Sequence, residues 1–400
     1  MAGVPTFAGG PTVNILVVFP LVPWPPDQGD RLRAWEMLQA LAAAGTVTAV
    51  LLPSGPVAPE ALRRLRDVCG RVASLSLGTA ARAGAAAAGA LRGLPPAVAT
   101  HWSGAAVRAV AAEVPGPWDL ACAFQWRAAP FVRAVPARLR VLEMTDALGL
   151  YRRRLPARGR ALRQRLGLMG VERLERTWHR GFDAAWIASD ADADWVERLS
   201  GRRPSVVPNG CSPVASPAPY HPSGPLLFLG NMRYPPNEDG VLWLVRRVWP
   251  QARAALGPAA RLRLVGVPSP RVASLARVPG VEVAGRVPDA AAELAAASAA
   301  INPVRFGGGT NRKVLDAWAA ARPVISTPAG ARGFACDDGI HLLLASSPQE
   351  WVERLRWVQS HPAEAAALGR RGWEFAAEAL DARRLWAEAL APLLAAAGAG

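Results

Sequence analysis

Lysine is almost absent from this chain. It carries 46 lysine and arginine side chains, yet Lys313 is the only lysine. Cysteine is nearly as scarce, and Cys69, Cys122, Cys211 and Cys336 lie far apart without any Cys-x-x-Cys pair. This spacing excludes a disulfide framework or a cysteine-rich zinc site, and it predicts reduced thiols in a cytosolic protein.

Long apolar runs are missing as well. No stretch of about 18 or more residues is apolar and free of both charge and proline, so we expect no membrane-spanning helix. Residues 1–14 lack the basic start of a signal peptide, and we expect none. Charged residues make up 19% of the chain and hydrophobic residues 51%, which is typical of a globular protein. Its 400 residues are enough for two domains or more.

The charge balance is strongly basic. A formal net charge of +15 favours an acidic partner such as nucleic acid, an anionic lipid or a phosphorylated substrate. Because arginine replaces lysine almost everywhere, a cluster of arginines is by itself weak evidence for a binding site. The single lysine says more, since a compact ammonium stands where arginine would be the default.

The first half of the chain alternates between apolar strands and helices. Helical periodicity runs over residues 31–44 and 59–69. Continuous apolar strands separated by helices predict a parallel sheet that is covered on both faces. The predicted strands are residues 13–19, 47–52, 120–124, 140–144 and 184–188.

The same pattern restarts after a stretch rich in proline, serine and alanine. The second set of predicted strands is 226–230, 261–265, 281–285, 299–303, 324–327 and 341–345, with helices over 239–255 and 311–321. We therefore predict an α/β protein with two Rossmann-like domains that face each other across a cleft. The predicted domains are residues 1–208 and 225–400, joined by a linker over 209–224, and the last helices can pack back on the N-terminal domain. Ligands of such sheets bind outside the carboxyl ends of the strands.

Three glycines stand directly before the single lysine, in the sequence FGGGTNRKVLDAW (306–318). They lie between a buried strand and a helix, so backbone N–H groups of Gly308, Gly309 and Thr310 can approach a ligand closely. The helix start adds free N–H groups and a partial positive charge, and Lys313 adds an ammonium suited to phosphate oxygens. Asp316 shares the face of Lys313 and can accept hydrogen bonds from ribose hydroxyls. The alternative is a flexible turn in which Lys313 and Asp316 form an exposed ion pair.

Three aspartates, Asp190, Asp192 and Asp194, imitate an Asp-x-Asp metal motif. They follow a strand and open a helix, where serine and aspartate cap free N–H groups, so we favour capping and predict no metal site. The arginine-rich segment 151–166 can rest on an anionic membrane or receive a lipid-linked acceptor. The alternative for that segment is a solvated helix face.

Two further loops follow strands in the first half. In PPDQGDR (25–31), Gly29 can bring backbone near the phosphates of a bound ligand, while Asp30 and Arg31 can bind a second ligand. The alternative is an ordinary turn in which Asp30 caps the helix. Asp146 follows another strand and is a candidate for a catalytic or acceptor-orienting role, with helix capping as the alternative.

Several segments together carry a resemblance to a known family. They are VPWPPDQGDRLR (22–33), VVPNG (206–210), LLFLGNMRYPPNEDGVLWL (226–244), GRVPD (285–289) and, most strongly, residues 303–334. These segments resemble the retaining glycosyltransferases of group 1 (family 4), which have the GT-B fold. The resemblance covers nearly the whole chain, and its N-terminal part is similar to sugar transferases of exopolysaccharide gene clusters.

The resemblance implies transfer of a sugar from a nucleoside-diphosphate sugar, UDP- or GDP-linked, to a hydroxyl acceptor such as a glycan, a lipid-linked intermediate or a small molecule. It implies polysaccharide biosynthesis in the cytoplasm or at the inner membrane face, without a metal ion or other cofactor. It makes Lys313 and Asp146 the catalytic candidates. Donor contacts are implied for Gly29, Asn231, Arg233, Arg286, Val287, Pro288, Arg305, Gly308, Gly309, Thr310, Lys313 and Asp316.

The chain departs from the family pattern at three positions. Many members have a glutamate eight positions before the residue that matches Asp316, where this chain has Gly308. The Gly-Arg that often ends the first strand of the C-terminal half is Gly230-Asn231 here, with Arg233 as a nearby substitute. Many members have a histidine of the N-terminal domain near the reacting centre. The corresponding strand end here is EMTDAL (143–148), which makes Asp146 the candidate.

Two other functions stay open from the sequence. A GT-B epimerase that acts on a nucleotide sugar needs acid and base carboxylates around the sugar, and Gly308 counts against it. A non-catalytic protein that binds polyanions or membranes would explain the positive charge. No basic and aromatic RNA-binding motif is visible, so we expect no nucleic-acid partner.

Overall fold

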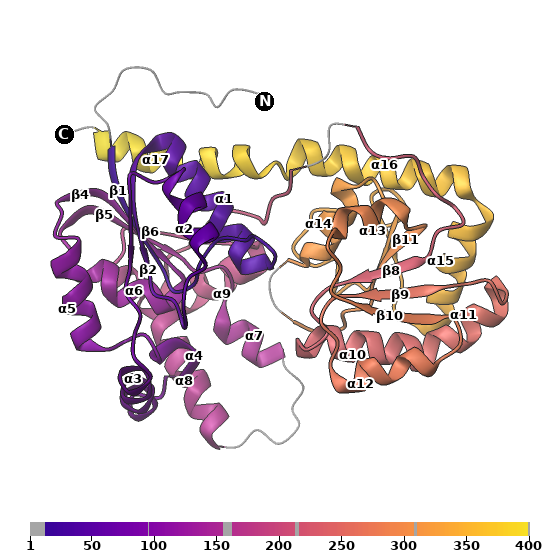
Figure 1. Cartoon of the computed structure of the whole chain (residues 1–400), viewed down its shortest axis with the longest axis horizontal. Coiled ribbons are helices and arrows are strands. Elements are labelled where there is room, and N and C mark those ends of the chain that lie inside the picture. The colour runs from indigo at the N-terminus through magenta and orange to yellow at the C-terminus, as the bar shows by residue number, and fades with distance from the viewer. Residues whose placement is uncertain (1–12, 95, 155–161, 213–215, 308–309, 399–400) are drawn as a thin grey trace. The chain divides into compact units, whose positions relative to one another are not determined.

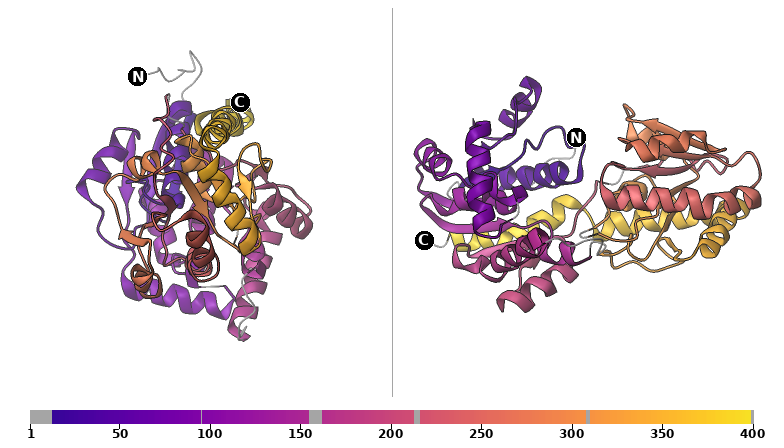
Figure 2. Two further views of the ribbon diagram at one scale, coloured as in Figure 1. Left: turned by 90° about the vertical axis from the view of Figure 1, so that its right-hand side faces the viewer. Right: turned by 90° about the horizontal axis from the view of Figure 1, so that it is seen from below.

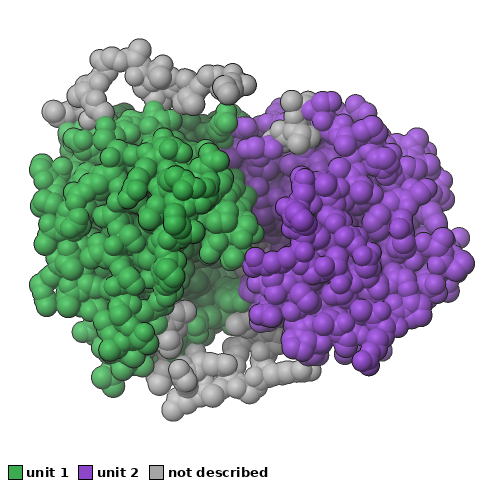
Figure 3. All heavy atoms as spheres, in the orientation of Figure 1, with its two compact units in different colours: residues 1–208, 383–400 green, residues 209–382 purple. Residues whose placement is uncertain are grey.

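The computed structural model describes residues 13–94, 96–154, 162–212, 216–307 and 310–398. The chain divides into two compact units (Figure 3). Unit 1 comprises residues 1–208 and 383–400, and unit 2 comprises residues 209–382. Residues 209–224, which the sequence presents as a linker, therefore belong to unit 2, and the last helix belongs to unit 1.

Unit 1 is built on a parallel sheet, which has seven strands among the described residues (Figure 1). They lie in the order β3-β2-β1-β4-β5-β6-β7. The strands are β1 (Val13–Phe19), β2 (Gly45–Leu51), β3 (Arg71–Ser74), β4 (Trp118–Phe124), β5 (Ala137–Glu143), β6 (Ala184–Ile187) and β7 (Ser205–Val206). The first strand is central, since Ile15 lies opposite Val47 of β2 on one side and Leu120 of β4 on the other.

Helices connect these strands and cover the sheet. They are α1 (Gly29–Ala44), α2 (Pro59–Arg66), α3 (Thr79–Leu91), α4 (Pro96–Ala99), α5 (Gly104–Glu113), α6 (Gln125–Arg133), α7 (Leu148–Arg154), α8 (Leu162–Arg176), a 3₁₀ turn (Trp178–Arg180), α9 (Asp190–Ser200) and α17 (Ala382–Gly398). The aspartates at the start of α9 lie where the sequence predicts a helix start, and Ser189 caps it by accepting from the Asp192 N–H at 3.3 Å. Gly201, with φ of 71°, ends this helix in the left-handed conformation that glycine adopts without strain.

The apolar strands of unit 1 bury side chains on both faces. Along β1, Ile15, Val17 and Phe19 join one core cluster, and the alternating Leu16 and Val18 join the other. This is the pattern that a doubly covered parallel sheet requires. The first of these faces is covered by α1 and by α17, whose Trp386 and Leu390 lie in the same cluster (Figure 1; Figure 2).

Unit 2 repeats the architecture with six strands among its described residues, all parallel, in the order β10-β9-β8-β11-β12-β13. The strands are β8 (Leu226–Leu229), β9 (Leu262–Val265), β10 (Val281–Gly285), β11 (Ala299–Asn302), β12 (Val324–Ser326) and β13 (Leu343–Leu344). Numbered from its own first strand, each sheet has the Rossmann order 3-2-1-4-5-6, and this order continues to a seventh strand in unit 1. In unit 2 the strand order therefore reverses between β8 and β11.

The helices of unit 2 lie on both sides of its sheet (Figure 1). They are α10 (Pro235–Trp243), a π-helical turn (Leu244–Val248), α11 (Trp249–Leu256), α12 (Pro270–Ala273), a 3₁₀ turn (Ser274–Arg277), α13 (Ala290–Ala296), α14 (Arg312–Ala319), α15 (Pro348–Ser360) and α16 (Pro362–Ala379). Residues of α10, α11 and α15 build the core on one face, and residues of α13 and α14 build it on the other.

Candidate functional site

Lys313 lies at the point of unit 2 where the strand order reverses. It stands in the first turn of α14, and its Nζ donates to Asn237 Oδ1 at 3.1 Å and to Asn311 Oδ1 at 3.3 Å. The ammonium also lies 5.7 Å from the centre of the Phe228 ring on β8. The side chain is half-buried, so it is directed into the protein and not toward bulk solvent.

Burial sets the protonation of this lysine. Desolvation lowers the pKa of Lys313 to about 8, and the nearby charge of Asp316 acts more weakly in the opposite direction. Its two hydrogen-bond partners are neutral amides, so no carboxylate neutralises the ammonium by direct contact. A bound anion would supply the missing charge.

Glycines at the ends of three neighbouring strands leave space beside the lysine. Gly230, Gly266 and Gly285 follow or end β8, β9 and β10, and all three have positive φ. A Cβ on Gly266 would lie 2.0 Å from the backbone oxygen of Gly230, so these loops pass each other backbone to backbone. A Cβ on Gly230 would lie 3.5 Å from Cε of Lys313. The strand ends therefore present backbone, free of side chains, next to the ammonium.

Asn237 joins the loop after β8 to Lys313. This buried side chain of α10 donates from Nδ2 to the Asn231 carbonyl at 2.9 Å and accepts from Lys313 through Oδ1. It stands in the PPNEDG segment that the family resemblance uses, but the sequence analysis gave it no role. The signal that could have found it is an amide in the first turn of a helix that directly follows a strand end.

The loop after β11 carries several sequence candidates. Gly308 and Gly309 lie outside the described residues. Thr310 is half-buried, and its hydroxyl accepts a hydrogen bond from Asn209. Arg305 forms two hydrogen bonds of 2.9 Å to the carboxylate of Asp239 and lies over the Trp243 ring. Its guanidinium is thus engaged with α10.

Asp316 is paired within its own helix. The Nε of Arg312 donates to Asp316 Oδ1 at 2.8 Å, and Nη1 of the same arginine donates to the Gly210 carbonyl at 2.5 Å. Burial lowers the pKa of Lys313 and the negative charge of Asp316 partly opposes this, but the hydrogen-bonding partner of Asp316 is Arg312, one turn earlier in the helix.

The remaining donor candidates follow β8 and β10. The exposed Asn231 accepts from the Arg233 N–H at 3.0 Å, and Arg233 Nε donates to the Pro268 carbonyl at 3.3 Å. Arg286 and Pro288 are exposed, while Val287 is half-buried against the core that includes α14. The side chain of Arg286 makes no hydrogen bond to another described residue.

A buried polar network fixes the ends of β11 and β12. Asn302 donates from Nδ2 to Ser326 Oγ at 3.1 Å and to the Gly330 carbonyl at 3.0 Å. The Thr327 hydroxyl donates to the Val304 carbonyl and accepts from the Gly330 N–H. The network holds the loop that leads to α14, and the sequence analysis did not identify it. Polar residues at the end of an apolar strand, as in the INP and IST segments, are the available signal.

Unit 1 carries a buried ion pair at the carboxyl end of β5. Arg33 of α1 binds Glu143 through Nε–Oε1 at 2.8 Å and Nη2–Oε2 at 3.0 Å, and both side chains are fully buried. Arg33 also donates to the Val207 carbonyl at 2.9 Å, and Glu143 accepts from the Thr145 N–H at 2.6 Å. The pair thus joins α1, β5 and the chain after β7, and the sequence analysis did not identify it.

Asp146 follows this pair and is half-buried. Its carboxylate accepts no hydrogen bond from a described residue, and α7 begins only at Leu148. Burial raises the pKa of Asp146 to about 7, the negative charge of Asp192 adds to the rise, and Arg33 opposes it. A carboxyl group in this state can accept or donate a proton near neutral pH.

The start of α7 is held in place behind Asp146. The fully buried Glu175 of α8 accepts from the Gly149 N–H at 3.0 Å and from Trp195 Nε1 of α9 at 2.9 Å. Burial raises the pKa of Glu175 to about 7. These bonds connect α7 with α8 and α9, which fixes the backbone that follows Asp146.

The other candidates in unit 1 make local contacts. Asp30 Oδ1 accepts from the Arg31 N–H at 2.9 Å, and Arg31 Nη1 pairs with Asp27 at 3.1 Å. A Cβ on Gly29 would meet nothing within 4 Å, so no close approach within the protein requires a glycine there. Asp190 and Asp194 both pair with Arg203.

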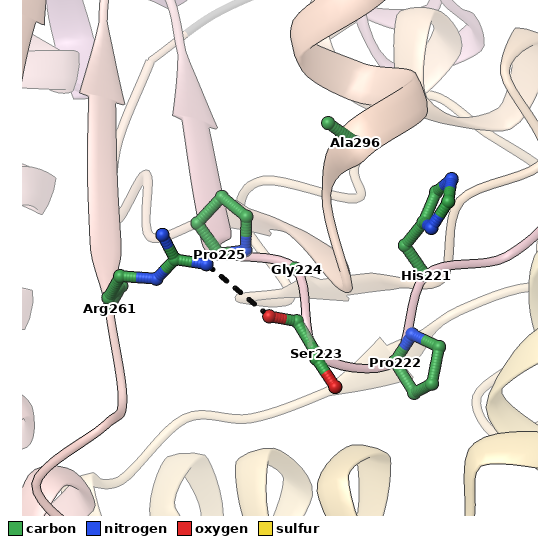
Figure 4. A pocket seen from close by; sticks show the side chains of 7 residues that line it. All are labelled: His221, Pro222, Ser223, Gly224, Pro225, Arg261 and Ala296. Atoms are coloured by element: carbon green, nitrogen blue, oxygen red, sulfur yellow. Dashed lines mark hydrogen bonds between the residues drawn. The ribbon is translucent and has the colours of Figure 1, made fainter.

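A hollow of about 500 Å³ lies at the opposite edge of the unit 2 sheet, where β8 and β9 begin (Figure 4). Residues 221–225 form one wall, and Arg261 and Ala296 lie near it. The guanidinium of Arg261 donates to the Ser223 carbonyl at 3.5 Å. This hollow is separate from the strand ends that surround Lys313.

Comparisons with known proteins agree with this architecture. Residues 224–361 match the sequence model of the family described as Glycosyl transferases group 1. No curated protein sequence matches the chain. Among the described residues, no helix is both long enough and apolar enough to cross a membrane.

Solved structures resemble the chain over almost its full length. A sucrose-phosphate synthase from Thermosynechococcus elongatus has 19% identity and a TM-score of 0.71 over 96% of this chain and 100% of the other. HepE from Anabaena, in complex with UDP and glucose, has 14% identity and a TM-score of 0.66 over 96% and 100%. The N-terminal domain of trehalose-6-phosphate phosphatase from Candida albicans has 12% identity and a TM-score of 0.61 over 96% and 97%. The chain therefore has the GT-B fold of two Rossmann-like domains, and its residues 224–361 match the group 1 glycosyltransferases.

Proposed function

We propose that this protein is a retaining glycosyltransferase that moves a sugar from a nucleoside-diphosphate sugar to a hydroxyl acceptor. The observation that carries the proposal is Lys313, a half-buried ammonium without a carboxylate contact, located at the switch point of the unit 2 sheet. Ligands of doubly wound sheets bind at that point, outside the carboxyl ends of the strands. The family match over residues 224–361 and the complexes of HepE with UDP and with UDP-glucose support it further.

In this proposal the hard step is departure of the nucleoside diphosphate. The bond between the anomeric carbon and the diphosphate oxygen breaks, and negative charge builds on the phosphate oxygens. Lys313, the N–H groups at the start of α14 and Arg233 stabilise that charge. Gly308, Gly309 and Thr310 contribute backbone N–H groups. The acceptor oxygen attacks the same face of the sugar, and its proton passes to the leaving phosphate.

The nucleoside and the acceptor have their own candidate contacts. Asp316 binds the ribose hydroxyls, and Arg286, Val287 and Pro288 bracket the base, while Asn231 and Arg305 complete the donor side. Gly29, Asp30 and Arg31, which lie in the first turn of α1 and not in the preceding loop, are the candidates to meet the donor phosphates or the acceptor. Asp146 orients the acceptor hydroxyl, whose proton passes to the leaving phosphate. UDP- and GDP-linked sugars are the proposed donors, and no metal ion takes part.

Calorimetric titration with UDP, GDP and ADP tests the donor site. We expect at least one of them to bind, and we expect Lys313→Ala to weaken that binding about tenfold or more, because a charge-assisted hydrogen bond contributes about 1.5–3 kcal/mol. Arg356→Gln is the control, since it removes one exposed positive charge from α15 in the same unit. Absence of nucleotide binding at millimolar concentration, or equal loss in both variants, would contradict the proposal.

Incubation with a panel of nucleotide sugars distinguishes the reactions. A transferase should hydrolyse its own donor slowly, releasing the α-configured sugar if an α-linked donor reacts with retention, whereas an epimerase would return a new nucleotide sugar. NMR spectroscopy of the products separates these outcomes. A non-catalytic polyanion-binding protein would leave all donors unchanged and would bind polyanions with steep salt dependence and no dependence on Lys313.

We also propose that unit 1 contacts an anionic membrane surface, which suits a cytoplasmic enzyme with a lipid-linked acceptor in polysaccharide biosynthesis. Of the arginine-rich segment 151–166, residues 155–161 lie outside the described residues, so the support comes from exposed side chains of α3 and α8. Leu91 at the end of α3 is 92% exposed and Met169 on α8 is 65% exposed. The two helices meet near these residues, because a Cβ on Gly170 would lie 2.2 Å from the Gly93 carbonyl oxygen. Exposed arginines, Arg92 and Arg173, flank the apolar pair. Apolar groups surrounded by basic ones suit an interface of anionic lipids.

Vesicle sedimentation tests this contact. The protein should sediment with vesicles that contain phosphatidylglycerol and not with pure phosphatidylcholine. Replacing Leu91 and Met169 by serine should lower the affinity for these vesicles at least tenfold, because each apolar side chain contributes up to about 1.5–3 kcal/mol when it leaves water. Replacing Tyr234 and Ile340 by serine, two exposed apolar residues of unit 2, serves as the control. Equal loss in both variants would contradict this surface.

A further inference from the structure

A second hollow lies in unit 1, and arginine side chains line it. It has a volume of about 510 Å³ and is lined by Arg133, Arg140, Arg180 and the segment around Asp183. Arg133 ends α6, Arg140 belongs to β5, and residues 178–183 precede β6. The hollow therefore lies where β5 and β6 begin, at the opposite edge of the sheet from Glu143 and Asp146.

Three guanidinium groups share this hollow with one carboxylate. That carboxylate, Asp183, accepts from the Arg140 backbone N–H at 2.8 Å and makes no hydrogen bond to a guanidinium among the described residues. Arg140 donates from Nη2 to the Val135 carbonyl at 2.8 Å. The side chains of Arg133 and Arg180 make no hydrogen bond to any described residue.

This arrangement differs from other arginine clusters in the molecule. Arg203 in unit 1 pairs with three carboxylates, and Arg263 in unit 2 pairs with two. The lining of the hollow instead leaves an excess of positive charge that the protein does not neutralise. Because these guanidinium groups line one hollow and none of them binds a carboxylate among the described residues, an anion in the hollow would supply the missing negative charge.

Local packing holds one of these guanidinium groups in place. The guanidinium of Arg133 lies 5.0 Å from the centre of the Phe182 ring, and a Cβ on Gly181 would lie 2.4 Å from its Nε. The absence of a side chain at residue 181 thus lets the guanidinium lie against the backbone. Two buried nitrogens of the lining, Arg140 Nε and His179 Nδ1, have no hydrogen-bond partner among the described residues.

We propose that this hollow binds a small ligand through a phosphate group. Guanidinium groups match phosphate oxygens in pairs of hydrogen bonds and keep their charge at all relevant pH values. A volume of about 510 Å³ is far larger than the share of about 30 Å³ that one water molecule occupies, so a phosphate ester or diphosphate has room. The site contains none of the residues of the proposed donor site and does not depend on the proposed function.

The test uses the full-length protein with Lys313→Ala, which removes the main cation of the donor site. Inorganic pyrophosphate is titrated by calorimetry, and we expect one site. Arg133→Gln combined with Arg180→Gln should weaken its binding at least tenfold. The control combines Arg66→Gln with Arg108→Gln, which removes the same charge from exposed positions on α2 and α5 of the same unit and should leave binding unchanged.

Further measurements check that the variants fold and identify the kind of ligand. Circular dichroism and thermal unfolding confirm that the variants are folded, which is expected because Arg133 and Arg180 are exposed. Titration with a sugar phosphate, compared with sedimentation on vesicles of phosphatidic acid, distinguishes a free phosphate ester from a lipid headgroup. Absence of pyrophosphate binding at millimolar concentration, or equal loss of binding in the control variant, would overturn the proposal.

Discussion

Lys313 combines a charge, partial burial and neutral partners in one residue. Desolvation lowers its pKa to about 8, which means that the folded protein without ligand holds this proton less firmly than the unfolded chain does. The buried charge therefore lowers the free energy of unfolding below pH 8. This destabilisation disappears as the pH rises from 8 toward the ordinary pKa of lysine. A bound diphosphate would reverse the shift, because it stabilises the charged form.

The affinity for a nucleoside diphosphate should depend on this proton. Above pH 8 the free protein loses the proton that the complex needs, so we expect the dissociation constant to rise by up to about tenfold per pH unit between pH 8 and 10. Calorimetry over this range measures it. Lys313→Met should bind weakly with a flat profile, and an equally steep profile in that variant would assign the titration to another group.

The raised pKa of Asp146 predicts that a substitution which removes its charge stabilises the folded protein. Because its folded pKa is raised to about 7, the folded state binds more protons than the unfolded state between about pH 4 and 7, and its contribution to stability falls as the pH rises through this window. At pH 8 the charged form is the one that is disfavoured. Asp146→Asn should therefore raise the free energy of unfolding by about 1–2 kcal/mol at pH 8, and by much less at pH 4.

Urea denaturation at both pH values measures this difference. Asp67→Asn, at an exposed position after α2, is the control and should show no such dependence on pH. A loss of stability in Asp146→Asn at pH 8 would show that the carboxylate has a stabilising partner.

Sequence reasoning at this scale worked where composition made a residue stand out. The single lysine and the glycines before it pointed to the strand end where Lys313 now lies. The partners of the lysine and of Arg33 were not found, because Asn237 and Glu143 lie far from them in the chain. Contacts across such distances in sequence depend on how strands are ordered in the sheet, which local patterns do not specify. The roles assigned to the site residues stay predictions.

At the scale of elements, the strand ends of unit 2 lie unusually close to each other. The loops after β8 and β9 approach so closely at Gly230 and Gly266 that no side chain fits between them. Gly266 also has φ of 125°, which residues with a side chain rarely adopt. The position of Gly230 next to Lys313 therefore depends on a glycine at the end of another strand.

Gly266→Ala should displace these loops and disturb the donor site. We expect nucleotide binding to fall at least tenfold, and the free energy of unfolding to fall by more than the cost of about 1–2 kcal/mol for an unfavourable backbone conformation alone. Calorimetry and urea denaturation measure the two effects. Gly257→Ala is a matched control, because Gly257 has φ of 94° but nothing within 4 Å of its Cβ position. Similar losses of binding in both variants would contradict this account.

Most elements were predictable because apolar strands and amphipathic helices have distinct periods. The strand predicted over residues 281–285 has the same bounds in the structure, whereas the strand predicted over 341–345 is shorter there, at Leu343–Leu344. The helix predicted over 239–255 begins earlier, at Pro235, and includes a π-helical turn at Leu244–Val248. The short edge strands β3 and β7 were missed, since β3 lacks fully buried side chains and β7 has only two residues.

At the scale of the whole molecule, the chain leaves unit 1 after residue 208 and returns to it at residue 383. The returning helix α17 contributes Trp386 and Leu390 to the core beside α1, and Trp386 also lies 5.0 Å from the guanidinium of Arg33. Composition marked the end of the first segment clearly, because proline and serine gather there. It did not mark the return, because only two residues separate α16 from α17 and the two helices have similar composition.

Trp386→Ala should destabilise unit 1. Truncating a buried tryptophan costs about 3–5 kcal/mol, because apolar contacts are lost and a cavity remains. Thermal unfolding should show the transition of unit 1 at lower temperature, with the transition of unit 2 less affected. Leu91→Ala, at a 92% exposed position in the same unit, should change the free energy of unfolding by less than about 0.5 kcal/mol. A shift confined to unit 2 would contradict the assignment of α17.

The return of α17 also affects the order in which the protein can mature during its synthesis. A ribosome makes residues 209–382 before it makes the helix that completes the core of unit 1. Until that helix emerges, the apolar side of α1 and the buried Arg33 lack their cover, while unit 2 already has every strand of its sheet. Unit 1 can therefore complete its hydrophobic core only after residues 383–400 have been synthesised.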